Sequence, residues 1–183
     1  MCYELIVGAI ALVIGAGFMR LIYDKSGEKK EKYFFCAVVI NILIQSFLIY
    51  AYIRLRGGFV VHGCIYAVTG ALLLGAAVLW ASRMLFSFAH EGFRVLLGIS
   101  AIVAGCLGGC GIDMPIAYEA GVSGISNYSS ALALCVGAIS VMLSDVTIMV
   151  KNFSVKDLKI TRIIFDITSL VGIAMIFYGA VIA

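Results

Sequence analysis

The chain has 183 residues, of which 63% are hydrophobic and only 13% charged, with a single proline and a formal net charge of +3. A soluble domain carries about 25% charged residues and cannot hide so much apolar surface from water. The composition therefore excludes an ordinary soluble domain and predicts an all-α, polytopic membrane protein. The small positive charge gives no reason to expect nucleic-acid binding.

Six apolar stretches are predicted to be transmembrane helices that form one bundle, a single integral membrane domain over residues 1–183. Each is close to the roughly 20 residues that a helix needs to cross a hydrocarbon core of about 30 Å. Helices are expected because backbone amides in lipid need internal partners, and no stretch shows the period-two alternation of a barrel strand. The predicted helices are 3–23, 34–53, 59–82, 95–112, 131–150 and 163–183.

The basic residues predict the orientation of the bundle. Short connectors rich in Lys and Arg resist translocation and stay in the cytoplasm. Only Arg54 and Arg56 belong to a connector after an even-numbered helix. The others cluster around the ends of helices one, three and five: Arg20, Lys25, Lys29, Lys30, Lys32, Arg83, Arg94, Lys151, Lys156, Lys159 and Arg162. We therefore expect both termini to be external, in a plasma (inner) membrane whose bilayer is the first partner of the chain.

The first and fourth predicted helices share a weak internal likeness. The sequence GAIALVIGAG starts at Gly8 and GISAIVAGCLG starts at Gly98, so Gly8 and Gly15 match Gly98 and Gly105 at a shift of 90 residues. With three helices in each half, such a repeat would give two halves that are inverted in the membrane, as in many transporters. Coincidence between two glycine-containing apolar helices is the alternative.

Polar residues in the second and third helices predict a site near the middle of the membrane. Asn41 and Gln45 lie one turn apart, and Gln45 and Thr69 are each about 15 Å from their helix ends. Because a short turn joins the two helices, we expect them to be antiparallel neighbours that bring Gln45 and Thr69 together. The patch would bind a solute, or it would only join the helices by hydrogen bonds worth about 0.6 kcal/mol each.

Small residues recur at every fourth position in the third and fourth helices. Such faces allow helix backbones to approach closely in lipid. They predict close packing within the chain, and they also suit self-association or contact with other membrane subunits. The residues are Gly63, Ala67, Ala71 and Gly75 in the third helix, and Ala101, Gly105 and Gly109 in the fourth.

The longest connector, 113–130, is expected to be external, either as a flexible loop or as a segment that dips towards the membrane. Within it, Gly121-Val122-Ser123-Gly124 resembles the GxSG motif around the nucleophilic serine of rhomboid proteases. That serine needs a histidine base from a later helix, but no histidine follows Ser123. We therefore do not expect an enzyme.

No metal site or cofactor is expected either. The chain has six cysteines and two histidines, but it contains no Cys-x-x-Cys pair, no HExxH sequence and no Walker lysine. Cys106 and Cys110 share a helical face, where small apolar packing is the simpler interpretation.

Two aspartates lie within the last two spans, near their cytoplasmic ends. Asp145 and Asp166 are each about 6 to 8 Å inside the predicted boundary. If both face the interior, they form a proton or cation site to which Ser169 and Ser144 add oxygen ligands. Alternatively, each pairs with a basic side chain such as Arg20 or Arg162.

The sequence thus favours a membrane transporter or channel-like protein, or a subunit of one, that moves a small solute or ion through a polar site in a helix bundle. The alternative is a non-catalytic assembly subunit whose small-residue faces bind other chains in a membrane complex.

The orientation can be tested by cysteine labelling. Because most basic residues lie on the opposite side, a cysteine introduced beside Ala183 should react with a membrane-impermeant reagent in intact cells. A reaction that requires permeabilised cells would reverse the predicted topology.

Overall fold

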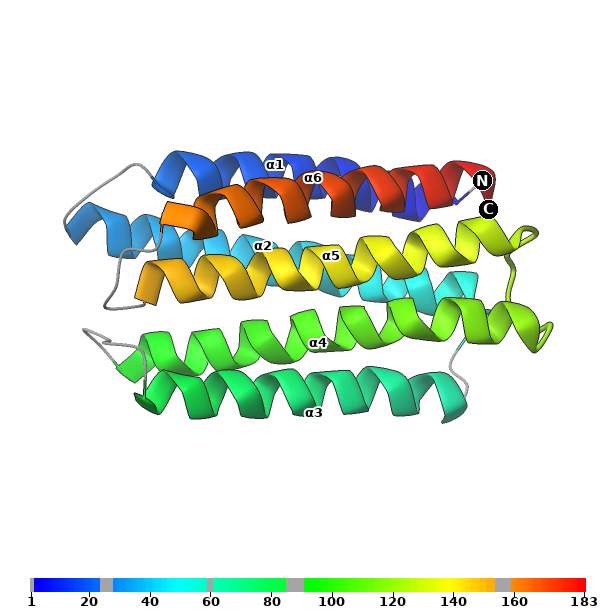
Figure 1. Cartoon of the computed structure of the whole chain (residues 1–183), viewed down its shortest axis with the longest axis horizontal. Helices are drawn as coiled ribbons and strands as arrows, with labels where there is room; N and C mark the ends of the chain where they lie inside the picture. The colour runs from blue at the N-terminus through cyan, green and yellow to red at the C-terminus, as the bar shows by residue number, and fades with distance from the viewer. Residues whose placement is uncertain (1, 24–27, 59–60, 85–90, 154–158) are drawn as a thin grey trace.

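The computed structural model describes residues 2–23, 28–58, 61–84, 91–153 and 159–183; the side chains of 20–23, 28–32, 62, 81–84, 91–94, 149–153 and 159 are not part of the description. Its helices are α1 (Tyr3–Tyr23), α2 (Glu28–Leu55), α3 (Val61–Met84), α4 (Glu91–Glu119), α5 (Tyr128–Phe153) and α6 (Lys159–Ile182). The prediction of an all-α bundle is confirmed (Figure 1). Five helices are long and apolar enough to cross a membrane, and α1 contributes the shorter apolar segment Tyr3–Met19. The chain is therefore an integral membrane protein.

The helix α4 is longer than predicted. It continues past residue 112, through Pro115, to Glu119. The expected connector of 113–130 is therefore wrong, and the link between α4 and α5 is confined to residues 120–127. The glycines at the end of the predicted helix are packing positions within a continuous helix, which explains why they do not end it.

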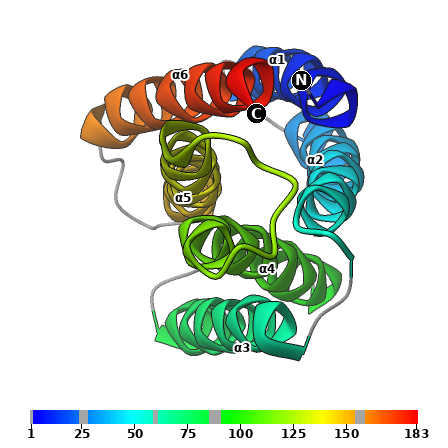
Figure 2. The same cartoon turned by 90° about the vertical axis from the view of Figure 1, so that its right-hand side faces the viewer.

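Five helices form a ring, and the sixth lies outside it. Around the ring, α1 contacts α2, α2 contacts α4, α4 contacts α5, α5 contacts α6, and α6 returns to α1. The remaining helix, α3, packs against α4 only, and in the described part of the chain it does not pack against α2. The end view in Figure 2 shows α3 beside α4, at the edge of the assembly.

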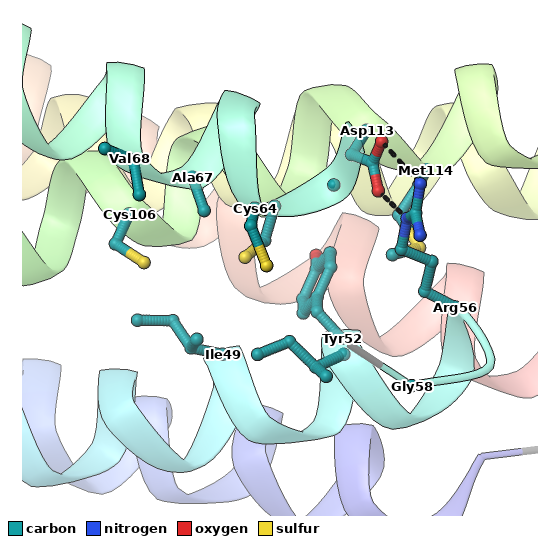
Figure 3. Close-up of a pocket in the computed structure, with 13 residues that line it drawn as sticks. Ile49, Tyr52, Arg56, Gly58, Cys64, Ala67, Val68, Cys106, Asp113 and Met114 are labelled. Carbon is teal, nitrogen blue, oxygen red and sulfur yellow. Dashed lines mark hydrogen bonds and ion pairs between the residues drawn. The ribbon is translucent and has the colours of Figure 1, made fainter. Parts of the chain in front are cut away.

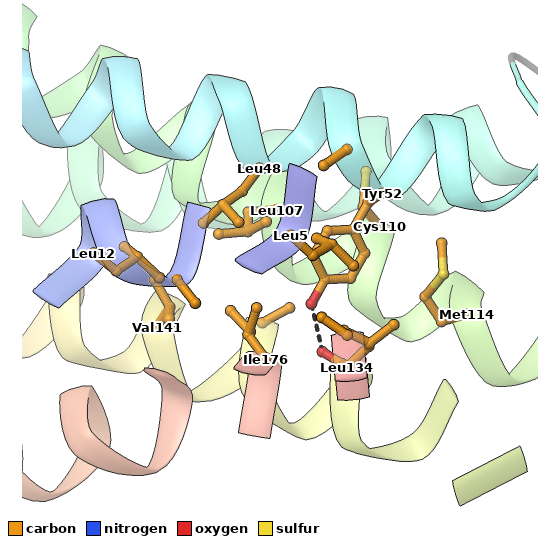
Figure 4. Close-up of a cluster of buried hydrophobic side chains, with 14 of the residues drawn as sticks. Leu5, Leu12, Leu48, Tyr52, Leu107, Cys110, Met114, Leu134, Val141 and Ile176 are labelled. Atoms are coloured by element: carbon orange, nitrogen blue, oxygen red, sulfur yellow. Dashed lines mark hydrogen bonds between the residues drawn. The ribbon is translucent and has the colours of Figure 1, made fainter. Parts of the chain in front are cut away.

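The ring encloses the main hydrophobic core, to which every ring helix contributes (Figure 4). Each ring helix contributes at least one fully buried side chain; examples from α1, α2, α4, α5 and α6 are Leu5, Leu48, Leu107, Leu134 and Ile176. Across this core, the Tyr52 hydroxyl donates a hydrogen bond of 2.7 Å to the carbonyl oxygen of Leu134. A buried phenol needs such a partner, and this bond links α2 to α5 although the two are not neighbours in the ring.

Glycines allow α3 to dock on α4, as the small-residue pattern predicts. A Cβ atom added at Gly105 would overlap the carbonyl oxygen of Gly70, and one added at Gly109 would overlap the carbonyl oxygen of Tyr66. The two backbones are thus in direct contact. Close backbone approach is how helices associate in lipid, where apolar surface gives no hydrophobic driving force.

The connection from α4 to α5 closes one end of the ring. The Gly124 amide donates a 2.8 Å hydrogen bond to the Leu55 carbonyl at the end of α2, and Ile125 is buried in the main core. The termini lie at this same end in Figure 1, where the Cys2 amide donates to the Ala180 carbonyl at 2.9 Å. Which side of the membrane this end faces stays a prediction.

The helix contacts follow an inverted repeat only in part. A repeat that relates α1, α2 and α3 to α4, α5 and α6 matches the α1–α2 contact with α4–α5, and the α3–α4 contact with α6–α1. It also requires α2 to pack against α3 as α5 packs against α6, which the described residues do not show. The interpretation as two inverted halves is supported at these two pairs of interfaces only.

Because α3 and α4 touch through glycines, one methyl group added at this contact should lower the stability of the protein, whereas one added at an open glycine should not. Gly105→Ala should destabilise the protein by about 1–3 kcal/mol, because the added Cβ overlaps the Gly70 carbonyl and forces the helices apart. Gly17→Ala is the matched control, since a Cβ at Gly17 meets no packing neighbour within 4 Å among the described residues. Thermal unfolding in detergent should show a lower midpoint for Gly105→Ala only, and equal midpoints would contradict the packing.

Candidate functional site

A buried carboxyl group with two amide partners forms the most polar feature of the ring interior. Asp145 lies on α5 and is 5% exposed. The Asn41 side-chain amide of α2 donates to Oδ1 of Asp145 at 2.8 Å, and the Gln45 amide, one turn further along α2, donates to Oδ2. Like the Tyr52 bond, these hydrogen bonds link α2 to α5 across the interior of the ring.

Hydroxyl groups lie next to this carboxyl. The hydroxyls of Ser144, on α5, and Ser169, on α6, are 2.6 Å apart. Both serines line a cavity of about 30 Å³, together with Asn41 and Asp145. A buried cavity needs at least roughly 10–15 Å³ to hold a water molecule. The space beside the carboxyl group therefore has room for a water molecule or a small ion.

The electrostatics of the cluster are unusual for the inside of a membrane protein. In the described part of the chain, Asp145 forms its hydrogen bonds with neutral amides and with no basic side chain. An ionised carboxylate in a low-dielectric interior is costly without a compensating charge. The group therefore favours a bound proton or a bound cation. Among the described residues, Gln45 Oε1 is buried without a hydrogen-bond partner, although Gln45 does not line the cavity.

The expected contact between Gln45 and Thr69 is wrong. Gln45 is fully buried inside the ring, whereas Thr69 is exposed on α3, which does not pack against α2 in the described residues. The physical reason is that the glycine face of α3 docks on α4. A short turn places α2 and α3 antiparallel, but it does not force them into contact.

The structure also separates the two aspartates. Asp166 is partly buried on α6, but it does not line the cavity beside Asp145. Of the predicted charge partners, Arg162 is exposed at the start of α6, and the side chain of Arg20 lies outside the described residues. Ser169 is the one predicted oxygen ligand of α6 that reaches the Asp145 cavity.

A buried ion pair forms a second polar feature, near the end of the bundle that holds the termini. Arg56 follows α2, and its guanidinium donates from Nε to Oδ2 of Asp113 on α4, with Nη2 3.4 Å from Oδ1. Their side chains are only 7% and 2% exposed. The third nitrogen, Nη1, is buried and has no hydrogen-bond partner among the described residues.

This ion pair lies at one end of a groove between α2 and α3, with α4 as its floor (Figure 3). The groove has a volume of about 330 Å³. Apart from the pair, apolar side chains and cysteines dominate its lining. They include Ile49, Tyr52 and Ile53 from α2, Cys64, Ala67 and Val68 from α3, and Cys106, Cys110 and Met114 from α4.

Among the described residues, no three His, Cys, Asp or Glu side chains gather where they could hold a metal ion together. A cation bound at Asp145 would depend on one carboxylate and on neutral oxygens. Such a set suits a small hard cation of low charge and not a transition metal.

Sequence reasoning missed both of these polar contacts. The sequence predicts that Asn41 and Gln45 face the next helix along the chain, but their partner lies on α5. It also places Arg56 and Asp113 in connectors on the same side of the membrane, without pairing them. Opposite charges close to the same end of two spans were the available signal for that pair.

Comparison of the chain with protein-family models, with curated proteins and with solved structures finds no match. The interpretation of the site therefore depends on its geometry.

The Arg56–Asp113 pair predicts a non-additive effect on stability. Arg56→Met should destabilise the protein by about 3–5 kcal/mol, because Asp113 would be left as an unpaired buried charge. Arg56→Met combined with Asp113→Leu should recover most of that loss, since two apolar side chains leave no charge behind. Thermal unfolding of the two variants in detergent would measure the recovery. A double variant that is less stable than Arg56→Met would contradict this prediction, because the ion pair would then be a net source of stability.

Proposed function

We propose that the protein is a membrane transport protein, or the transport subunit of one, in which the Asp145 site binds a proton or a small monovalent cation. The observation that carries this proposal is a carboxyl group inside the helix ring that has amide and hydroxyl neighbours but no basic partner among the described residues. Ionisable groups inside membrane segments are costly and are typical of ion pathways and proton relays.

The size of the site favours an ion over an organic solute. The cavity beside Asp145 measures about 30 Å³, whereas pockets for drug-sized molecules measure about 300–1,000 Å³. The single negative charge of the Asp145 carboxylate would be balanced by one proton or one monovalent cation. Asp145 and the hydroxyls of Ser144 and Ser169, which line this cavity, would supply oxygen ligands.

The position of the site allows ion binding at Asp145 to change how α2 and α5 are arranged in the bundle. Asn41 and Gln45 belong to α2 and Asp145 to α5, so a change at the carboxyl alters a link between two helices that are not ring neighbours. Ion binding that favours one arrangement of α2 and α5 over another would couple occupancy to access. No enzymatic role and no cofactor are needed in this mechanism.

The proposal predicts loss of ion movement when the charge of Asp145 is removed. Asp145→Asn keeps the shape of the side chain, and it should reduce proton or Na⁺ flux in proteoliposomes to the level of protein-free vesicles. An internal pH dye and a Na⁺ tracer would measure the flux under imposed gradients.

Glu119→Gln is the matched control, because Glu119 is an exposed acid at the end of α4 and its replacement should leave flux unchanged. Asp166→Asn tests the other predicted aspartate in the same assay. Wild-type flux in the Asp145→Asn variant, or wild-type protein that moves no ion, would contradict the proposal.

A role as a non-catalytic assembly subunit is the second candidate. It is favoured by the position of α3, which has one helix neighbour in the described part of the chain and exposes Thr69 and the large side chain of Trp80. Polar groups on a lipid-facing helix often mark contacts with another membrane helix. The mass of the complex purified in mild detergent separates the two candidates, since an assembly subunit should be isolated with a different protein chain.

A further inference from the structure

We propose that the groove between α2 and α3 is a binding site for a membrane phospholipid, with one acyl chain in the groove and a phosphate oxygen at Arg56. The proposal is independent of the Asp145 site. It depends on the groove, on its apolar lining and on the unpartnered Nη1 atom of Arg56.

The polar end of the groove needs an acceptor. Two nitrogens of the Arg56 guanidinium face Asp113, but Nη1 is buried with no partner in the described part of the chain. A buried donor without a partner is destabilising, and phosphate oxygens are strong acceptors for a guanidinium. A phosphodiester group would satisfy Nη1 without displacing the Asp113 contact.

The rest of the groove matches a hydrocarbon chain. Its walls are dominated by apolar side chains and cysteines along neighbouring turns of α2, α3 and α4, and Arg56 and Asp113 lie together at one end (Figure 3). A phospholipid has the same arrangement, with its phosphate at the membrane boundary and its chains directed towards the middle of the bilayer. The α2 span ends at Leu55, so Arg56 lies just beyond the apolar segment, where a headgroup is expected.

The volume of the groove suits a single acyl chain. It is about 330 Å³, roughly twice the ~150 Å³ cavity that accommodates benzene. A flexible hydrocarbon chain can therefore fill the space between α2 and α3.

The position of α3 explains why the groove exists. Its glycine face fixes α3 on α4, and α2 contacts α4 elsewhere, so the two helices stand apart over a shared floor. An empty space there would deprive its lining of van der Waals contacts, which an acyl chain would restore.

The first test uses the wild-type protein in proteoliposomes that contain a phosphatidylglycerol with a diazirine in one acyl chain. After illumination, peptide mapping should find the label concentrated at the groove residues Cys64, Ala67 and Val68. Equal labelling of the exposed residues Leu72 and Leu73, on α3 but outside the groove, would mean that only bulk lipid is present and would overturn the proposal.

The second test fills the groove. Val68→Trp places a large side chain at the groove, while Ile65→Trp is the matched control, because Ile65 is 54% exposed against 55% for Val68 but does not line the groove. Native mass spectrometry in mild detergent should show one retained phospholipid per chain in the wild type and in Ile65→Trp, and its loss in Val68→Trp.

A third test distinguishes the contribution of the phosphate contact from that of the acyl chain. Arg56→Met with Asp113→Leu should lose the retained phospholipid while the groove stays open, and added inorganic phosphate should not displace the lipid from the wild type. Displacement by phosphate would mean that the site binds a free anion. A retained mass equal to a second copy or to another protein would assign the groove to a protein partner, and either result would overturn the proposal.

Discussion

The hydrogen bonds from Asn41 and Gln45 to Asp145 are the interaction on which the functional interpretation depends. Inside a bilayer no water is available to solvate a polar group, so the partners of a carboxyl must come from the protein or from a bound ion. Here the protein supplies two amide donors on α2 and leaves a water-sized space with two serine hydroxyls beside the acid. Among the described residues, Asp145 has only neutral hydrogen-bond partners, whereas Asp113 is paired with Arg56.

The position of α3 separates the two polar features of the bundle. Because the glycine contact places α3 on the outer side of α4, the ring of five helices closes without it. The interior of the ring contains Asp145 and its amide partners, whereas the outer groove contains Arg56 and Asp113. One site is thus small and polar, and the other is larger and mainly apolar, which suits an ion and a lipid respectively.

Most of the fold could be predicted from the sequence, because lipid permits few solutions. Long apolar stretches fix the number of helices, and Gly105 and Gly109 mark a face of close approach that the structure confirms. The neighbours of α2 could not be predicted, since sequence spacing indicates depth and direction but not which helix lies opposite. For the same reason Gln45 was paired with Thr69 and not with Asp145. The end of α4 was misjudged because glycine ends helices in water but supports packing in membranes.

The central claim is that the Asp145 carboxyl exchanges a proton or a cation within the closed ring. Infrared difference spectroscopy of the reconstituted protein observes this group directly, through carboxyl bands that are present in the wild type and absent in Asp145→Asn. The proposed role predicts that such a band changes reversibly when the proton or Na⁺ concentration is stepped. A band for Asp145 that stays the same under every condition would show a fixed structural hydrogen bond, and it would contradict the role in ion binding.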